Sequence, residues 1–475
     1  MTDFDILCEK VSKLVAPTPN EKKRILDLAE TIRRNVSTTC TRFGLQAEVR
    51  IDGSVAKDTW LSREADVDIF MRVPSDLPRA EFERRSLEIA KEAMKSHKTV
   101  ERFAEHPYLE SWVEDVRINI VPCYNVEKGK WQSATDRTPY HTEYMKEHLD
   151  DGLRQEVRLL KKLMKATEIY GADIKTSGFS GFLCEVLILR SGSFKDLLES
   201  AAAWKRRHVV DVDGLYAGRE SEVFDMFDEP LIVIDPVDHA RNVAAAVAEK
   251  RMWEFVALSR ILPKHPRMEF FYPPKPSSPT SKRLRQTLKS GSSLVFVTFG
   301  KVDAVVDILW SQLYKTEKSL RNVLQEKGFT VYRSAAWSNE QNLNVLVFEL
   351  ENHRIPRIRR HLGPQVERRE ESERFLERHV NANDTLAGPW IEQERWKVHK
   401  RRDYVDAIQF LRYHLRKGGR EIGVGSRISK TLENGFRLLR ETEVDKLVEK
   451  DVVFARYLYK FLNGTPTWLR WTPDA

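Results

Sequence analysis

Two aspartates stand two residues apart in the segment GSVAKDTWLSREADVDIF, which covers residues 53–70. Residues i and i+2 of a β-strand point to the same face of a sheet, so Asp66 and Asp68 would present their carboxylates side by side, about 6.6 Å apart along the strand. Adjacent carboxylate oxygens are ligands that suit Mg²⁺. Two such ions can activate a nucleophile and stabilise a departing pyrophosphate.

A tight turn precedes these aspartates. Gly53 allows the backbone to approach a ligand closely, and the hydroxyl of Ser54, together with nearby backbone N–H groups, can meet the oxygens of a triphosphate. An isolated D-x-D segment is most often a solvated strand end. Here the turn, the strand context and the residues that follow favour a site for nucleotidyl transfer.

The spacing of hydrophobic residues predicts the helices and strands around Ser54, Asp66 and Asp68. Residues 17–44 carry apolar side chains at helical intervals and are expected to form a helix that Asn20 caps. Strands are expected over three ranges, 46–53, 65–73 and 112–124, the last as one unbroken strand. Helices mixed with strands predict a small α/β domain over residues 1–145.

The middle of the chain is expected to be mostly helical. Residues 146–262 include an apolar stretch at 178–194 that reads as a buried helix, and an alanine-rich helix is expected to start near Asp238. A stretch rich in Pro and Ser over residues 264–283 then marks a domain boundary.

The last part of the chain, residues 263–475, is expected to hold a β-α-β unit followed by helices. The unit consists of a strand, a helix and a strand over residues 292–300, 309–328 and 342–350, which fits a ferredoxin-like or RNA-recognition-like sheet. From His353 onward the chain is dense in charge and is expected to be helical, with most arginines on solvated faces and some in contact with phosphates.

Composition limits the class of protein. The chain has 475 residues, of which 41% are hydrophobic and 32% charged, and a net charge of +8. This allows several packed domains, and suits either a polyanionic partner such as nucleic acid or a basic protein without one. Four cysteines, none at metal-ligand spacing, are typical of a reduced, cytoplasmic protein. No run of about 18 apolar residues is present, so no membrane partner is expected.

Further segments follow the turn and the aspartate pair in a fixed order. They are AEHPYLESWVEDVRINIVPCY, SATDRTPYHTEYM, EVRLLKKLMKATEIYGADIKTSGFSGFLCEVLI, DPVDHARNVAA and LGPQVE. The turn and the pair resemble the nucleotidyltransferase superfamily of DNA polymerase beta. The ordered set resembles the archaeal, class I CCA-adding enzymes, which are tRNA nucleotidyltransferases, through nearly the whole chain and least after residue 365.

The resemblance implies a multidomain α+β fold. It has a polymerase-beta-like nucleotidyltransferase head over residues 1–145, a helical neck that recognises the nucleotide over 146–262, and a tRNA-binding region over 263–475 made of a ferredoxin- or RNA-recognition-like body and a helical tail. The implied reaction adds C, C and A to the 3′ end of tRNA from CTP and ATP without a template, with two Mg²⁺ ions. The implied partners are the tRNA acceptor stem and 3′ end, the nucleoside triphosphates and, as one option, a second copy of the chain.

The resemblance also assigns roles by motif position. Ser54 and Lys57 would contact the triphosphate, and Asp66 and Asp68 would hold Mg²⁺. The residues implied to line the nucleotide pocket are His141, Lys161 and Tyr170, with Arg241 selecting C and A together with tRNA phosphates. The family usually carries arginine at the position of Lys57, which keeps the charge without the planar, two-pronged donor. Each of these side chains also has a structural interpretation, as a solvated cation, a surface histidine or a core aromatic residue.

The family carries an aspartate where this chain has Asn119. An asparagine can offer one carbonyl oxygen to a metal but brings no negative charge and cannot take a proton. Asp115 lies on the same predicted strand face but about 13 Å away, too far to substitute. Three interpretations remain open: a deliberate change that traps an inactive complex, a natural homologue that binds tRNA without extending it, or a site that tolerates Asn at a reduced rate. The difference of one atom favours the first.

Two other classes of function share part of this pattern. A poly(A) polymerase or an oligoadenylate synthetase uses the same Gly-Ser and D-x-D chemistry, although the DPVD and GFSGFLCEVL segments favour the CCA-adding class. A catalytically dead, RNA-binding homologue is the alternative that is not an enzyme.

Overall fold

The computed structural model describes residues 2–103, 105–274, 286, 288 and 291–469, and the chain forms two compact units. The first unit comprises residues 1–274 with 467–475, and the second comprises residues 275–466. Part of the predicted Pro- and Ser-rich boundary, residues 275–283, lies outside the described residues.

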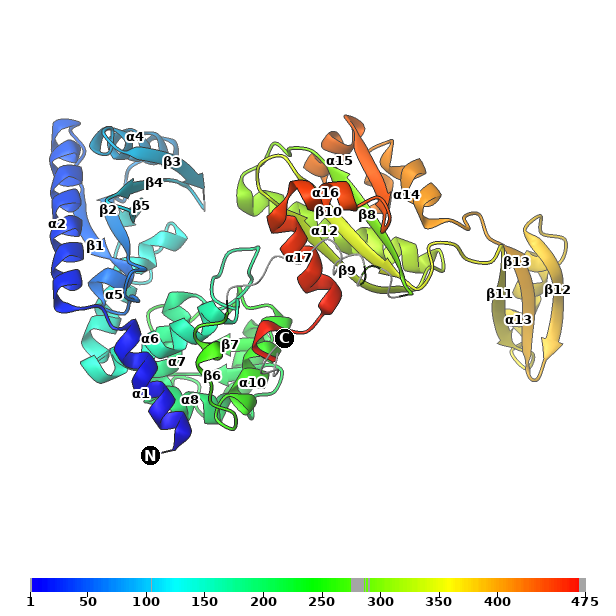
Figure 1. Ribbon diagram of the computed structural model, residues 1–475, viewed down its shortest axis with the longest axis horizontal. Helices are drawn as coiled ribbons and strands as arrows, with labels where there is room; N and C mark the ends of the chain where they lie inside the picture. The colour runs from blue at the N-terminus through cyan, green and yellow to red at the C-terminus, as the bar shows by residue number, and fades with distance from the viewer. Residues whose placement is uncertain (1, 104, 275–285, 287, 289–290, 470–475) are drawn as a thin grey trace. The chain divides into compact units, whose positions relative to one another are not determined.

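The head of the first unit is built on a five-stranded sheet with the order β1-β2-β5-β4-β3. Its strands are β1 (Glu48–Asp52), β2 (Asp66–Pro74), β3 (Lys98–Phe103), β4 (Pro107–Val113) and β5 (Val116–Asn125), and only β2 and β5 pair in parallel. Helices α2 (Pro19–Arg42) and α4 (Arg79–Ala93) cover one face (Figure 1). Val67 and Ile69 are buried against them, so Asp66 and Asp68 lie on the opposite face.

Two local predictions for the head are wrong. Helix α2 is capped by Thr18, whose Oγ1 accepts from the backbone N–H of Glu21 at 3.2 Å, because Pro19 already occupies the first helical turn. The predicted strand over 112–124 is a hairpin: Glu114 and Asp115 form its turn with φ of 49° and 63°. Positive φ at both central positions is the geometry that a two-residue hairpin turn requires.

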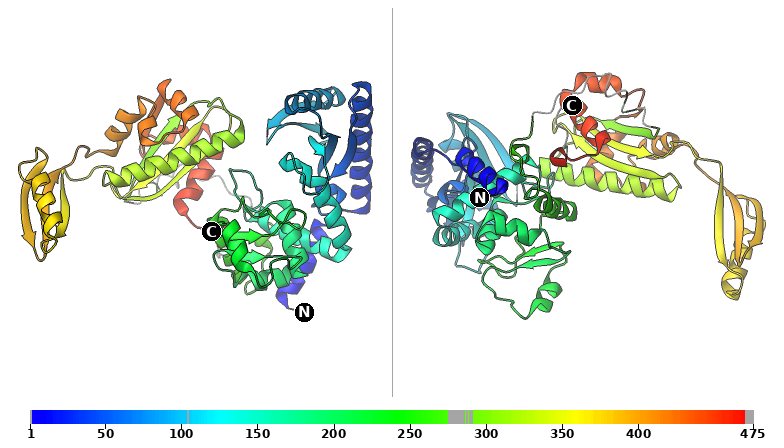
Figure 2. Two further views of the ribbon diagram at one scale, coloured as in Figure 1. Left: turned by 180° about the vertical axis from the view of Figure 1, so that it is seen from behind. Right: turned by 60° about the horizontal axis from the view of Figure 1, so that its bottom comes forward.

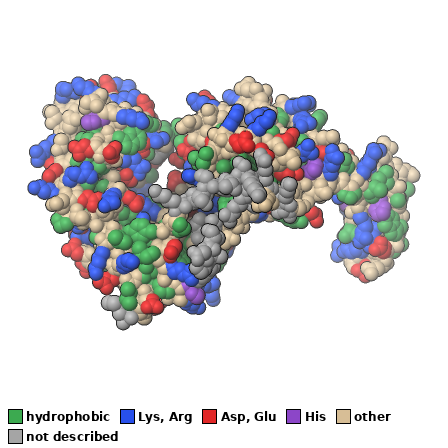
Figure 3. Space-filling view, viewed as in Figure 1, with side chains coloured by type: hydrophobic (Ala, Val, Ile, Leu, Met, Phe, Trp, Pro, Cys, Tyr) green, Lys and Arg blue, Asp and Glu red, His purple; other side chains and the backbone are tan. Residues whose placement is uncertain are grey.

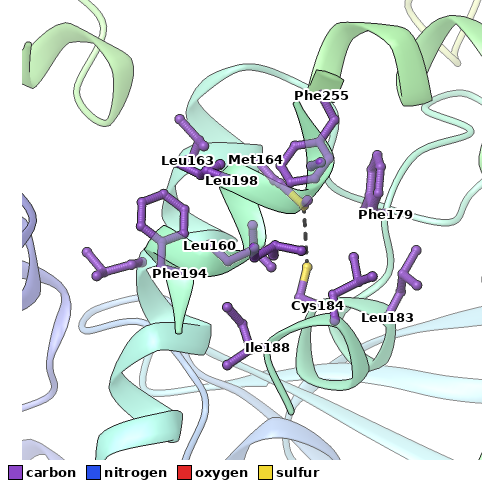
Figure 4. Packing of buried hydrophobic residues seen from close by; sticks show 14 of the residues in the cluster. Leu160, Leu163, Met164, Phe179, Leu183, Cys184, Ile188, Phe194, Leu198 and Phe255 are labelled. Carbon is purple, nitrogen blue, oxygen red and sulfur yellow. Dashed lines mark hydrogen bonds between the residues drawn. The ribbon is translucent and has the colours of Figure 1, made fainter. Parts of the chain in front are cut away.

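The neck of the first unit is mainly helical. Its elements are α1 (Asp3–Val15), α5 (Thr138–His148), α6 (Asp151–Ala166), α7 (Gly181–Ser191), α8 (Phe194–Ala201), β6 (His208–Val210), α9 (Glu220–Met226), β7 (Leu231–Val233) and α10 (Glu249–Ile261), with the short 3₁₀ turns η2 (Met268–Phe270) and η4 (Thr467–Leu469). The 3₁₀ turn η1 (Ala134–Arg137) packs on β5 of the head, where Asp136 accepts from the backbone N–H of Tyr124. One apolar core joins α1, α6, α7, α8 and α10, and in it the Cys184 thiol lies 3.4 Å from the sulfur of Met164 (Figure 4). The predicted buried helix over 178–194 is therefore present as α7.

The alanine-rich segment after β7 is not a helix. The Asn242 side chain accepts from the backbone N–H of Val233 at 2.9 Å and of Ala244 at 2.8 Å, and donates to the carbonyl of Leu231 at 3.0 Å. These bonds tie the segment to β7, so tertiary contacts override its local helix propensity. The next helix, α10, begins only at Glu249, and the predicted helix near Asp238 is wrong.

The second unit contains a four-stranded antiparallel sheet with the order β14-β8-β10-β9. The elements are β8 (Ser293–Phe299), α12 (Val306–Glu326), β9 (Val331–Ser338), β10 (Asn344–Leu350), α14 (Ala407–Leu415), η3 (Arg420–Ile422), α15 (Ser426–Glu433) and β14 (Phe436–Arg440). Chain order and strand order match a ferredoxin-like sheet, as predicted. Helices α12, α14 and α15 cover one face, with α12 lying along the sheet in Figure 2, while α16 (Asp445–Lys450) and α17 (Val452–Asn463) cover the other. Neither face is left open for RNA in the manner of an RNA-recognition motif.

A segment inserted between β10 and α14 forms a second, smaller sheet. Strands β11 (Ile358–Gln365), β13 (Arg395–Arg401) and β12 (Thr385–Glu392) pair antiparallel in that order, and α13 (Arg369–His379) packs on β11 and β12. The prediction of helix throughout the region after His353 is therefore wrong for these three strands and for β14. Their pairing is long-range, and their many arginines and lysines hide the alternation that marks a strand. Among the described residues, no helix has the length and apolar character of a membrane span.

Candidate active site

The Asp66–Asp68 pair lies next to the turn that follows β1. Strand β1 ends at Asp52, Gly53 takes a φ of 71°, and the short helix α3 (Gly53–Ala56) begins there. A Cβ atom at position 53 would lie 2.1 Å from Oδ2 of Asp68. Only glycine allows both this backbone conformation and this approach, so the turn brings its backbone directly against the carboxylate.

Strand β5 supplies a partner to each aspartate. Asn119 stands opposite Asp68 in the parallel register and donates from Nδ2 to Oδ1 at 2.9 Å. Arg117 stands opposite Asp66 and donates from Nε to Oδ1 at 3.0 Å and from Nη2 to Oδ2. Burial raises the pKa of Asp68 to about 6, the hydrogen bond from Asn119 opposes this, and the charge of Asp66 adds to it. A carboxylate pair of this kind is stabilised by a nearby cation.

Asp115 does not supply the carboxylate that position 119 lacks. Asp115 lies in the hairpin turn rather than on β5. Across residues 2–103, 105–274, 286, 288 and 291–469, no group of three or more His, Cys, Asp or Glu side chains is placed to hold a metal ion. This face of the head sheet therefore carries Asp66, Asp68 and the neutral Asn119, with Glu110 of β4 opposite Asn119.

A buried carboxylate joins Lys57, which the resemblance assigns to the triphosphate, and Lys161, which it assigns to the nucleotide pocket. Glu185 on α7 is fully buried and accepts from Lys57 on Oε2, from Lys161 on Oε1 at 2.9 Å, and from Thr59 Oγ1 on Oε1 at 2.6 Å. Burial acts to raise the pKa of Glu185, but the charges of Lys161 and Lys57 outweigh it and hold the pKa at about 2. The glutamate stays ionised and holds the two ammonium groups together.

The two lysines differ in the donors that they have left. Lys161 is 2% exposed and uses all three N–H groups, on Glu185 and on the carbonyl and hydroxyl of Thr59 at 3.2 and 2.9 Å. Lys57 is 6% exposed and donates to Glu185, with its Nζ 5.6 Å from the ring centre of Phe182. An ammonium has three donors. Within the described residues Lys57 makes this one hydrogen bond, so N–H groups remain available on it, whereas all three of Lys161 are in use.

A second buried carboxylate organises the expected base pocket. Asp235 accepts from His141 Nε2 at 2.9 Å, from Arg241 Nη1 at 2.6 Å and from the backbone N–H of Val237 at 2.9 Å. Burial acts to raise the pKa of Asp235, but the hydrogen bond and charge of His141 and the charge of Arg241 bring it to about 2. Burial lowers the pKa of His141 despite this partner. The His141 ring stacks on Phe182 with centres 3.9 Å apart.

Comparison with known proteins agrees with this arrangement. Three family models match the chain: a nucleotidyltransferase domain over residues 32–141, the second domain of tRNA nucleotidyltransferases over 155–272, and the C-terminal domain of CCA-adding enzymes over 290–441. A CCA-adding enzyme of Methanothermobacter thermautotrophicus is 33% identical over 95% of this chain and 97% of its own length. The chain belongs to the CCA-adding enzymes. The CCA-adding enzyme of Halobacterium salinarum is 34% identical over 92% of this chain and 93% of its own.

Membership in the CCA-adding enzymes confirms the predicted family, enzyme class and nucleotidyltransferase fold. A solved structure of a cytoplasmic RNA terminal U-transferase also aligns, at 14% identity and a TM-score of 0.45, over 57% of this chain and 98% of its own. That similarity is too distant to bear on the activity.

The structure brings most of the sequence-assigned residues of this CCA-adding enzyme into one connected set. Contacts run from Arg241 through Asp235 to His141, on through Phe182 to Lys57, and through Glu185 to Lys161. A Cβ atom at Gly181 would lie 2.9 Å from the hydroxyl of Tyr170 and 3.6 Å from Nζ of Lys161, which places Tyr170 beside the same set. Ser54 lies in α3, half-exposed beside the aspartates.

Sequence reasoning missed the residues that hold these side chains in place. They are Glu110, Arg117, Phe182, Glu185 and Asp235. The signal for Glu185 is a single acid inside the apolar run GFLCEVLILR, since a charge in a buried helix needs a partner. The signal for Asp235 is its position directly before Pro236. A proline disfavours the helical conformation of the residue before it, which predicts that Asp235 lies outside a helix.

Proposed function

We propose that this enzyme adds C, C and A in turn to the 3′ end of tRNA, without a template, at the face of the head sheet that carries Asp66 and Asp68. The observation that supports this most strongly is the two carboxylates on one strand face, packed against the turn that holds Ser54, in a chain that belongs to the CCA-adding enzymes. The substrates are CTP, ATP and tRNA.

The two aspartates fit divalent cations. Burial, together with the charge of Asp66, raises the pKa of Asp68 to about 6, so a cation would stabilise this carboxylate, and Asp66 adds a second carboxylate on the same face. We infer that Asp66 and Asp68 hold Mg²⁺, with two ions bound in the full substrate complex. Bound there, the ions would offset charge on the phosphates and on the attacking hydroxyl. Asn119 gives the acidic site one negative charge less than a third aspartate would.

The remaining residues bind and orient the nucleotide. Lys57 offers its free donors to the triphosphate, and Ser54 adds a hydroxyl from the turn. Lys161 acts through Glu185 and Thr59, as a positioning residue that fixes Lys57 and the loop after α3. His141 and Tyr170 line the pocket, and Arg241 projects a guanidinium that is 38% exposed for contact with the base.

The second unit supplies phosphate contacts to the tRNA. Lys and Arg side chains are interspersed with Asp and Glu on the visible surface rather than gathered in one patch (Figure 3). Several arginines of α13 pair with glutamates on the same helix. Arg357, Arg359 and Arg378 form no ion pair with any residue in the part of the chain that the structure describes, which leaves them for phosphates.

We further propose a cytoplasmic location, where tRNA and nucleoside triphosphates meet. A homodimer stays a prediction that sedimentation velocity decides.

The experiment that tests the site uses the Asp66→Ala and Asp68→Ala variants of the full chain. Both should abolish residual transfer and weaken the Mg²⁺-dependent binding of CTP, while Asp76→Ala, in the loop after β2, should change neither. Metal-dependent CTP binding that stays the same in both site variants would contradict the proposed site.

Asn119 favours a second candidate function, in which the chain binds tRNA and nucleotide without extending the RNA. Nucleotide binding relies on Lys57 and Ser54, which Asn119 does not touch, whereas transfer needs the charge that position 119 lacks. Tight tRNA binding with no product from the starting protein, together with product formation by Asn119→Asp, would support this candidate.

A further inference from the structure

Arg117 lies between two acidic side chains on the active-site face of the head sheet. It forms two hydrogen bonds with Asp66, and its Nη1 lies 3.8 Å from Oε2 of Glu110. The Arg117 side chain is 45% exposed and that of Asp66 is 37% exposed, so neither is locked by packing. A guanidinium held on both oxygens of Asp66 repels a metal ion and therefore competes with it for this carboxylate.

Glu110 is oriented as a second partner for this guanidinium. It stands on β4 directly opposite Asn119 in the antiparallel register, and it is 5% exposed. Its Oε1 accepts both hydrogen bonds from Arg102, at 3.1 and 2.8 Å, which leaves Oε2 turned towards Arg117. In the described part of the chain Oε2 of Glu110 makes no hydrogen bond, and a nearly buried carboxylate of this kind gains from a cation that moves closer.

The neutral amide at position 119 matters for this arrangement. Asn119 is flanked by Asp68 on β2 and Glu110 on β4 and carries no charge. Arg117 therefore forms its ion pairs with Asp66 on β2 and with Glu110 on β4, the two strands that flank β5.

From this geometry we propose that Arg117 is an internal counter-cation of Asp66, and that Glu110 receives its guanidinium when a divalent cation takes Asp66. This rests on the proposed role of Asp66 and Asp68 as metal ligands. Arg117 then competes with the metal, and Glu110 relieves the competition. Both are positioning residues, since they act on the metal site through Asp66.

The test is the affinity of the full chain for Mn²⁺, measured by electron paramagnetic resonance with and without CTP and in the absence of tRNA. Arg117→Gln should tighten Mn²⁺ binding by about threefold or more, the scale of a half-exposed, two-pronged ion pair, and Glu110→Gln should weaken it by a similar factor. Arg84→Gln and Glu88→Gln, which change the same charges at an exposed pair on α4, should change nothing.

The double variant, Arg117→Gln with Glu110→Gln, distinguishes competition for Asp66 from a simple sum of two independent charge effects on the metal. Without Arg117 there is nothing for Glu110 to receive, so the double variant should bind Mn²⁺ as tightly as Arg117→Gln alone. Additive effects that return the affinity to its starting value, or an Arg117→Gln variant that binds no tighter, would overturn the proposal. A gain in affinity cannot come from misfolding, so the Arg117→Gln result stands even if Glu110→Gln lowers the melting temperature. If Asp66→Asn and Asp68→Asn bind Mn²⁺ like the starting protein, the metal site itself is wrong instead.

Discussion

Glu185→Gln removes the negative charge that holds Lys57 and Lys161 together inside the first unit. The variant keeps the size of the side chain and one acceptor oxygen, but it leaves two ammonium groups, 6% and 2% exposed, without a counter-charge. We expect the first unit to lose stability and the triphosphate to bind more weakly, because Lys57 is no longer fixed beside the turn.

The magnitude follows from the pKa of Glu185. A pKa of about 2, against the ordinary 4.5, corresponds to about 3 kcal/mol at 1.36 kcal/mol per decade. Burial lowers the pKa of Lys161, which offsets part of this gain. Removal of one partner from a buried ion pair usually costs about 3–5 kcal/mol. We therefore expect the free energy of unfolding to fall by about 2–3 kcal/mol at pH 7.

The pH dependence has a definite sign. A carboxyl whose pKa is lowered by folding stabilises the protein fully above its unfolded pKa and loses this effect as the pH falls towards its folded pKa. The contribution of Glu185 is therefore complete above about pH 5.5 and reduced by about 1 kcal/mol at pH 4. The gap in stability between the starting protein and Glu185→Gln should narrow by that amount between pH 7 and pH 4.

The assay is urea-induced unfolding at both pH values, with hydrogen exchange of α6 and α7 peptides to report on the neck alone. Glu88→Gln is the matched control, because Glu88 pairs with Arg84 on the exposed face of α4 and should contribute less than about 0.5 kcal/mol. A loss in Glu185→Gln that does not exceed the control, with unchanged exchange in α7, would refute the role given to this cluster.

Three further predictions concern catalysis and RNA binding. Asn119→Asp restores the charge at position 119 and should speed extension by at least about 10²-fold, equal to ~2.7 kcal/mol of barrier; a change below tenfold in single-turnover assays would contradict this. Arg241→Ala should reduce discrimination of CTP and ATP against UTP and GTP, with tRNA affinity nearly unchanged and Arg241→Lys in between; one common loss for all four nucleotides would make Arg241 structural instead. The affinity for tRNA should fall with salt, with a log–log slope of ~0.7–0.9 per neutralised phosphate, and a flat response in filter binding would exclude phosphate contacts as its source.

Local patterns in the sequence predicted the parts of the site that depend on neighbouring residues in the chain. The alternation of Asp66, Val67, Asp68 and Ile69 gives the face of each side chain directly, because the period of a strand is two. The Gly53–Ser54 turn follows from the same stretch. The pairing of Asn119 with Asp68 was implied only through the family, since strand register depends on residues 51 positions apart.

Features set by distant contacts were missed for the same reason. Glu185 meets Lys57 across 128 positions, and Asp235 meets His141 across 94. The segment around Arg241 has helix-forming alanines, yet Asn242 ties it to β7. The hairpin turn at Glu114 and Asp115 lacks the glycine that usually marks such a turn, so the sequence there resembled one strand.

The product formed on a tRNA that lacks its 3′ CCA is the most direct test of ordered C, C and A addition by this enzyme. The starting protein and Asn119→Asp are each incubated with this tRNA and with CTP alone, ATP alone, both, or all four nucleotides, and the 3′ ends are sequenced. We expect two C residues with CTP alone, and C, C and A followed by a stop with CTP and ATP together, faster in Asn119→Asp. Long A tails would instead indicate a poly(A) polymerase, and the absence of any product from both proteins despite tight tRNA binding would contradict the assignment of a transferase.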